Sequence, residues 1–152
     1  MQCLNPPQQD PCPTQITILA SSAFTPGDVQ EIKEIVTSFG LVPIVVPDLS
    51  GVLDCHIEDS SSAVTANGTN AAQLHSIGSS VFTLALGDSM RAGAQILEQR
   101  FNIPYEVFGE LTGLATVDKF LQALADISGV SVPEKYRRQR RQLQYVILEN
   151  HF

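Results

Sequence analysis

The sequence predicts an α/β protein with a four-stranded parallel sheet flanked by helices. Short apolar runs alternate with amphipathic stretches, turn residues separate them, and no hairpin signal joins two neighbouring runs. Strands that alternate with helices in this way pair in parallel through right-handed crossovers. We expect the strand order 2-1-3-4, although the order is not written in the sequence itself.

The first strand–helix–strand unit covers residues 15–50. Residues 15–20 form a nearly continuous apolar run, as in a strand that is covered on both faces. Thr25 is a good N-cap, Pro26 suits the first helical position, and Asp28 lies near the positive end of the helix. The apolar face of this helix repeats at helical spacing through Val29, Ile32, Val36 and Phe39. Gly40 is expected as the left-handed stop before a second strand over residues 41–46.

The remaining elements follow the same alternation. Third and fourth strands are expected over residues 81–86 and 105–108. We expect a short helix with Thr69 or Asn70 as N-cap and Gly78 as its end. A second helix is expected to begin at the N-cap Asp88 or Ser89, and a third to run from the N-cap Thr112 to Gly129. The clearest amphipathic helix carries Val117, Phe120, Leu121, Leu124 and Ile127.

Three parts organise the chain: a flexible Pro-rich arm over residues 1–14, an α/β domain over residues 15–132, and a final helix over residues 133–152 that Pro133 opens. The final helix is basic in its first half and apolar in its second. Its apolar residues cannot all share one stripe, so we expect a connector with more than one neighbour. An exposed surface of this kind promotes association, and the isolated chain is therefore expected to form a homodimer through residues 133–152.

Composition limits the classes of function. The 152 residues are 43% hydrophobic and 16% charged, as in a globular protein, and no run is long enough to span a membrane. The formal net charge of −7 disfavours nucleic acid as a partner. The charge is uneven, because residues 1–132 carry −10 and residues 133–152 carry +3. No secretory signal is expected, which indicates a cytoplasmic protein.

Candidate ligand residues are few. Cys3 and Cys12 lie in the arm, while Cys55 and His56 lie in a long polar loop over residues 47–68. None of them has the spacing of a metal site, and an odd cysteine count argues against a disulfide framework. The loop follows the second strand, at the edge where ligands bind in open α/β sheets, so a small-molecule site is one alternative. Incidental thiols and a surface imidazole are the simpler interpretation.

Residues 20–28 contain one glycine, so neither the dinucleotide-binding pattern nor the P-loop is met. The histidines His56, His75 and His151 show no triad or metal spacing. Arg91, in the first turn of a helix, either reaches an anion or a partner carboxylate or is simply exposed. The residue chemistry alone therefore predicts no catalytic residues and no metal site, and leaves enzymatic activity uncertain.

A series of short motifs resembles the nitrogenase component 1 family. The motifs, in order, are Thr25-Pro26-Gly27-Asp28, Phe39-Gly40-Leu41-Val42-Pro43, Pro47-Asp48-Leu49-Ser50-Gly51, Leu86-Gly87-Asp88-Ser89-Met90-Arg91, Ile103-Pro104-Tyr105, Leu111-Thr112-Gly113-Leu114 and Asp118-Lys119-Phe120-Leu121. Ser128-Gly129, Pro133, Arg137 to Arg140, Gln142-Leu143 and His151-Phe152 continue the match. Each motif is weak alone, but their common order over residues 15–152 is specific.

The resemblance implies one Rossmann-like domain, the middle one, of a scaffold on which the precursor of the iron–molybdenum cofactor is matured. Family scaffolds of this type pair with a NifE-like chain in a heterotetramer that carries iron–sulfur clusters and the cofactor precursor. The family's cluster-ligand cysteine lies in an earlier domain, so no cofactor is expected on this part alone. A subunit of the related protochlorophyllide or chlorin reductases is the second alternative.

Overall fold

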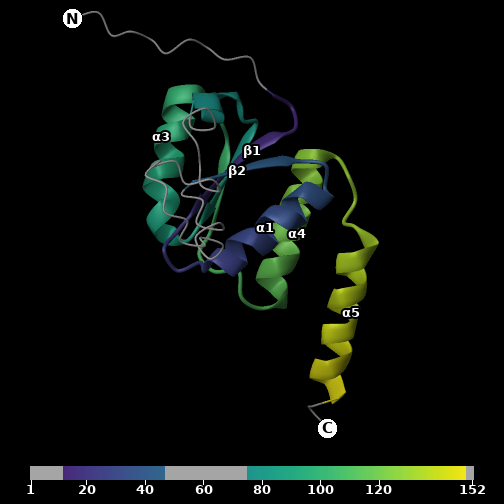
Figure 1. The fold of residues 1–152 in the computed structure, drawn as a ribbon. Coiled ribbons are helices and arrows are strands. Elements are labelled where there is room, and N and C mark those ends of the chain that lie inside the picture. Colours follow the sequence, from purple (N-terminus) through teal and green to yellow (C-terminus); the bar gives the residue numbers. More distant parts are fainter. Residues whose placement is uncertain (1–11, 47–74, 150–152) are drawn as a thin grey trace, which may run out of the picture.

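The computed structural model describes residues 12–46 and 75–149. Its strands and helices alternate along the chain, as the sequence predicts (Figure 1). The strands are β1 (Gln15–Ala20), β2 (Val42–Val46), β3 (Phe82–Leu86) and β4 (Tyr105–Phe108). The helices are α1 (Pro26–Ser38), α3 (Arg91–Phe101), α4 (Leu114–Ser128) and α5 (Glu134–Glu149), with 3-10 turns at Ile77–Ser79 and Asp88–Met90.

The four strands form one sheet in the order β2-β1-β3-β4, and every neighbouring pair is parallel. The predicted fold class and strand order are therefore confirmed. Ile18 in β1 stands beside Val45 of β2 and Leu84 of β3. All three residues are buried, because helices cover both faces of the central strands.

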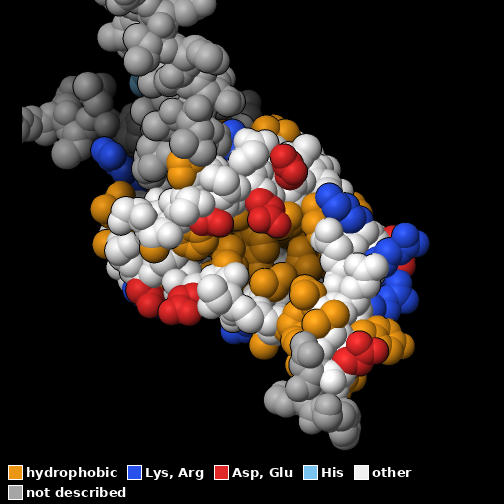
Figure 2. Space-filling model, turned by 60° about the horizontal axis from the view of Figure 1, so that its bottom comes forward, with side chains coloured by type: hydrophobic (Ala, Val, Ile, Leu, Met, Phe, Trp, Pro, Cys, Tyr) orange, Lys and Arg blue, Asp and Glu red, His pale blue; other side chains and the backbone are white. Residues whose placement is uncertain are grey.

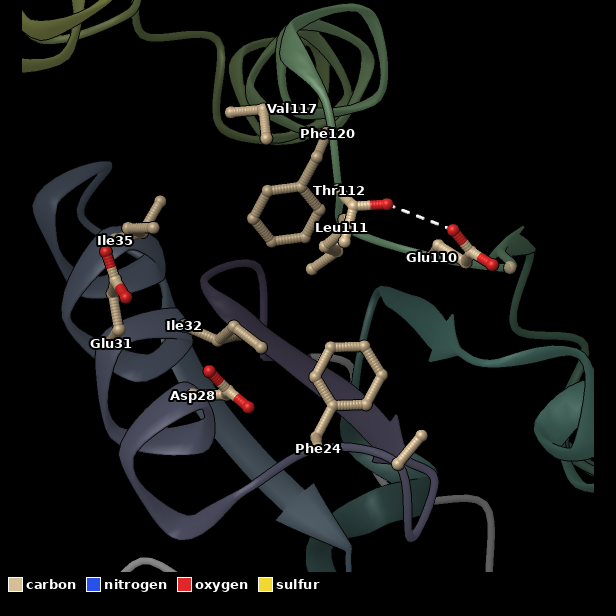
Figure 3. A pocket seen from close by; sticks show the side chains of 12 residues that line it. Phe24, Asp28, Glu31, Ile32, Ile35, Glu110, Leu111, Thr112, Val117 and Phe120 are labelled. Carbon is tan, nitrogen blue, oxygen red and sulfur yellow. Dashed lines mark hydrogen bonds between the residues drawn. The ribbon is translucent and has the colours of Figure 1, made fainter.

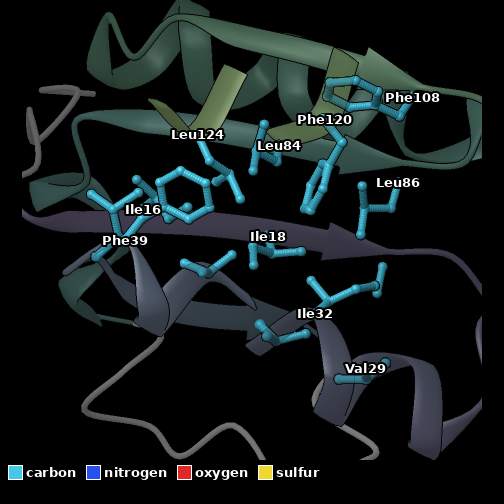
Figure 4. Packing of buried hydrophobic residues seen from close by; sticks show 14 of the residues in the cluster. Ile16, Ile18, Val29, Ile32, Phe39, Leu84, Leu86, Phe108, Phe120 and Leu124 are labelled. Atoms are coloured by element: carbon cyan, nitrogen blue, oxygen red, sulfur yellow. The ribbon is translucent and has the colours of Figure 1, made fainter. Parts of the chain in front are cut away.

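The main core lies between the sheet and helices α1 and α4, which cover the same face (Figures 1 and 4). Phe120 and Leu124 of α4 are 2% and 0% exposed, as the sequence predicts for this helix. The Phe120 ring meets Phe108 of β4 edge-on, with ring centroids 5.6 Å apart. A smaller cluster on the other face joins Leu19 and Ala85 to Ala94 of α3. The larger cluster therefore fixes where α1 and α4 stand.

Helix α1 begins as predicted, with Thr25 as N-cap. The Thr25 hydroxyl accepts from the Asp28 N–H at 3.2 Å, and the Asp28 carboxylate accepts from the Thr25 N–H at 2.8 Å. These reciprocal bonds form a capping box. The helix ends at Ser38, and Gly40, which follows the C-cap Phe39, has a φ of 76° that confirms the predicted left-handed stop.

Two predicted N-caps are wrong. Helix α3 follows a 3-10 turn and has no side-chain cap, so neither Asp88 nor Ser89 caps it. Helix α4 begins after Gly113, and the Thr112 hydroxyl donates to Glu110 instead of capping. Gly78 lies in the 3-10 turn that directly follows the helical residues His75 and Ser76, and an added Cβ there would come 2.9 Å from the Phe101 ring. A helix therefore ends near Gly78 as predicted, while its beginning lies outside the described residues.

Helix α5 runs back along the outer side of α4 and continues past the beginning of α4 (Figure 1). Its first turns are fixed by Tyr136, which packs against the main core, and by Arg140, which donates to both oxygens of Asp118 at 2.6–2.8 Å. The nine residues from Arg141 to Glu149 add roughly 13 Å of helix at about 1.5 Å per residue. The apolar side chains in this last part are all exposed: Leu143, Tyr145, Val146, Ile147 and Leu148.

Several predicted features lie outside the described residues. These are Cys3, Cys55, His56, His151, the loop over residues 47–68 and the caps Thr69 and Asn70. Of the predicted arm, only residues 12–14 are described, and the Thr14 carbonyl accepts from Val42 at the start of β2. Within residues 12–46 and 75–149, no helix has the length and apolar character that crossing a membrane requires.

Candidate functional site

An apolar hollow opens at the carboxyl edge of the sheet, between α1 and α4 (Figure 3). Its volume is about 580 Å³. Phe24 follows β1 and Leu111 follows β4, so the two loops at this edge supply one wall. The other walls come from α1 and α4, through Ile32, Ile35 and Phe120, with the half-exposed Val117 at the mouth.

Three carboxylates stand at the rim of the hollow: Asp28, Glu31 and Glu110 (Figures 2 and 3). The bonds that Asp28 accepts from the Thr25 N–H and hydroxyl lower the pKa of its carboxyl below the ordinary value. Glu110 is held by the Thr112 hydroxyl at 3.0 Å. No lysine, arginine or histidine is among the residues that line the hollow. The hollow is therefore an apolar surface with an acidic rim.

The side chains of the hollow suit contact more than catalysis. The lining residues contain one hydroxyl–carboxylate pair, Thr112 and Glu110, and both of its side chains are exposed at the rim rather than enclosed in the hollow, so we assign it no catalytic role. Residues 12–46 and 75–149 contain no group of three histidine, cysteine or acidic side chains that could hold a metal ion. The donor set in this part of the chain therefore does not fit an iron–sulfur cluster, which thiolates normally hold.

The other predicted candidates do not converge on the hollow. Arg91 is exposed and forms an ion pair with Asp88 at 3.3 Å, three residues earlier in the chain. Met90 is half-buried and packs against the smaller core cluster. Cys12 is a half-buried free thiol beside Thr14, and His75 is exposed. Phe24 and Leu111 were missed because they lie in turns, outside any periodic pattern.

The sequence profile of nitrogenase component 1 type oxidoreductases matches residues 2–152. A solved structure of nitrogenase Cp1 superposes with a TM-score of 0.80 at 28% sequence identity, over 90% of this chain and 30% of that chain. The chain therefore belongs to the nitrogenase component 1 family, and the resemblance read from its motifs is confirmed.

Three similar proteins are each called nitrogenase iron-molybdenum cofactor biosynthesis protein NifN. The relative from Nostoc sp. (strain PCC 7120) is 66% identical over 138 residues, which is 91% of this chain and 31% of that protein. The relative from Rippkaea orientalis is 48% identical over 148 residues, which is 91% of this chain and 32% of that protein. The relative from Rhodobacter capsulatus is 40% identical over 146 residues, which is 95% of this chain and 32% of that protein. The chain thus spans about a third of the length of these relatives.

Proposed function

We propose that this chain is part of a NifN-like scaffold on which the iron–molybdenum cofactor of nitrogenase is assembled, and that it works in nitrogen fixation in the cytoplasm. The observation that carries the proposal is the 66% identity to the Nostoc relative, whose name states this role. The contribution of the chain is architectural: a folded α/β unit with apolar surfaces for neighbouring parts of the assembly. No catalytic step is assigned to residues 12–46 and 75–149, and the cluster or cofactor precursor is cargo of the whole complex.

The proposed partner is a NifE-like subunit in a heterotetramer. In the longer chain, residues 15–132 would form the domain and residues 133–152 the connector to the next part. In the isolated chain the exposed end of α5 has no such neighbour, and we propose that it forms a homodimer through residues 133–152. Neither nucleic acid nor membrane is proposed as a partner, because the chain is acidic.

The two alternative functions have less support. A small-molecule site needs a few convergent polar groups in a concave pocket, and the lining of the hollow is apolar with carboxylates only at its rim. A protochlorophyllide or chlorin reductase subunit is disfavoured by the names of the three relatives described above.

Exchange of the matching segment tests the proposal. The 138-residue segment of the Nostoc relative is replaced by the corresponding part of this sequence, in cells that lack their own copy. We expect growth on N₂ and co-purification of the NifE partner. The matched control carries the corresponding segment of the Cp1 chain, which is only 28% identical, and should fail. A stable chimera that neither supports growth nor retains NifE would contradict the proposal.

A further inference from the structure

The hollow and the exposed end of α5 face the same side of the molecule. The hollow opens at the carboxyl edge of the sheet, where α4 begins, and Arg140 anchors α5 to Asp118 one turn into α4. The part of α5 beyond Arg140 therefore extends past the same edge, next to the mouth of the hollow (Figures 1 and 2). Val146 and Leu143 there are 54% and 53% exposed. We call the hollow and the exposed apolar end of α5 together the docking surface.

The charge around this docking surface defines what it can accept. Asp28, Glu31 and Glu110 surround the hollow, and its lining contains no basic residue to neutralise them. Asp28 and Glu110 accept hydrogen bonds from Thr25 and Thr112, but no lining residue supplies a positive charge. An apolar segment with flanking lysines or arginines would supply that charge at the polar rim, whereas a neutral or acidic one would not. The complementary occupant is an apolar helix with a basic flank.

The α5 helix of the same molecule cannot be this occupant. Its first turns are held on the outer side of α4 by the two-oxygen contact between Arg140 and Asp118, and by Tyr136 in the core. Arg141 and Arg137 both contact Glu134 within α5 itself. These three arginines of α5 are thus directed to α4 and to their own helix, and no residue of α5 lines the hollow.

We propose that this docking surface is a seam inside the longer polypeptide: it receives an apolar helix with a basic flank from the part of a component 1 chain that lies outside the matched third. The inference rests on the proposed function. It is supported by the length of the relatives, since the matched region is 31% of the Nostoc protein and the remaining chain has to pack around this unit. Apolar surfaces of this size are normally covered in a native protein.

Cysteine accessibility tests the seam. Ile35→Cys places a thiol in the wall of the hollow, and Ile96→Cys, on the exposed side of α3, is the matched control. Both are made in a chain whose native cysteines are replaced by serine, and in the Nostoc chimera in complex with its NifE partner. We expect maleimide to label both sites readily in the isolated 152-residue chain, at a concentration where it is monomeric. In the chimera, labelling of position 35 should slow at least tenfold, while position 96 should not change.

The proposed pairing between the acidic rim and the basic flank of the docked helix is tested separately in the same chimera. Glu31→Lys should repel the basic flank and raise labelling at position 35 at least threefold, whereas Glu98→Lys on α3 should leave it unchanged. Equal labelling of position 35 in the isolated chain and in a chimera that supports growth would overturn the seam while the proposed function stands. If the chimera does not assemble, the proposed function fails. The seam is then tested at the aligned positions of the unaltered Nostoc protein, where slow labelling supports it and rapid labelling overturns it.

Discussion

Helices α4 and α5 are both amphipathic and lie side by side, but they are covered very differently. Phe120 and Leu124 of α4 are almost fully buried against the sheet. Leu143 and Val146 of α5 remain more than half exposed, although they too lie on one side of a helix, three residues apart. The comparison teaches that an apolar stripe predicts a helix and a buried face, but it does not say whether the covering surface belongs to the same folded unit.

The largest expected effect is a difference in the free energy of unfolding between variants of the α4 stripe and variants of the α5 stripe. Phe120→Ala and Leu124→Ala should each lower the free energy of unfolding by about 2–5 kcal/mol, because they leave cavities in a close-packed core. The matched changes Leu143→Ala and Val146→Ala should change it by about 0.5 kcal/mol or less, since these side chains are exposed. Urea denaturation at a concentration where the chain is monomeric measures both pairs. Equal losses for the two helices would break the comparison.

A second prediction sharpens the claim that packing, rather than capping, places α4. Thr25→Ala removes the capping box of α1 and should cost about 1 kcal/mol. Thr112→Ala should cost about 0.5 kcal/mol or less, because Thr112 bonds to the exposed Glu110 side chain and caps no helix. Thermal unfolding of the two variants provides the test. A greater loss for Thr112→Ala than for Thr25→Ala would mean that α4 depends on a side-chain cap after all.

The smallest effect concerns the contact that joins the two helices. The hydrogen bonds from Arg140 lower the pKa of the Asp118 carboxyl, so its contribution to stability is present above the unfolded pKa of about 3.9 and is lost as the pH falls through the folded value. Asp118→Asn should cost about 0.5 kcal/mol or less at pH 7, because the pair is over a third exposed.

The pH dependence of this contact has a control on the same helix. Asp126→Asn removes a carboxylate that accepts only from Gln122 in the described contacts. Stability is measured from pH 7 to pH 2.5 for the parent chain and for both variants. We expect the difference between Asp118→Asn and the parent to shrink at acidic pH. A difference that grows as the pH falls would mean that the carboxylate is not stabilised by Arg140.

The fold was largely predictable from the sequence, whereas the hollow was not. Buried strands and helical stripes depend on neighbours in sequence, so β1, α1 and α4 follow from their patterns, and the capping box at Thr25 follows from residue types alone. The hollow joins Phe24 and Leu111, which lie 87 positions apart in two turns, and only the strand order brings these turns to one edge. The exposed apolar end of α5, by contrast, was expected from the sequence, because its apolar residues cannot all share one stripe. The pattern could not identify the surface that covers this end.

Size-exclusion chromatography with light scattering tests the central claim most directly, namely that the end of α5 is a contact surface lacking its partner in this unit. At high protein concentration we expect the parent chain to elute with the mass of a dimer. The double variant Val146→Ser/Leu148→Ser should elute as a monomer with unchanged thermal stability, because both side chains are exposed in the single chain. A parent chain that stays monomeric at high concentration, with Val146 and Leu148 protected from solvent, would contradict the account, since α5 would then be covered by its own domain.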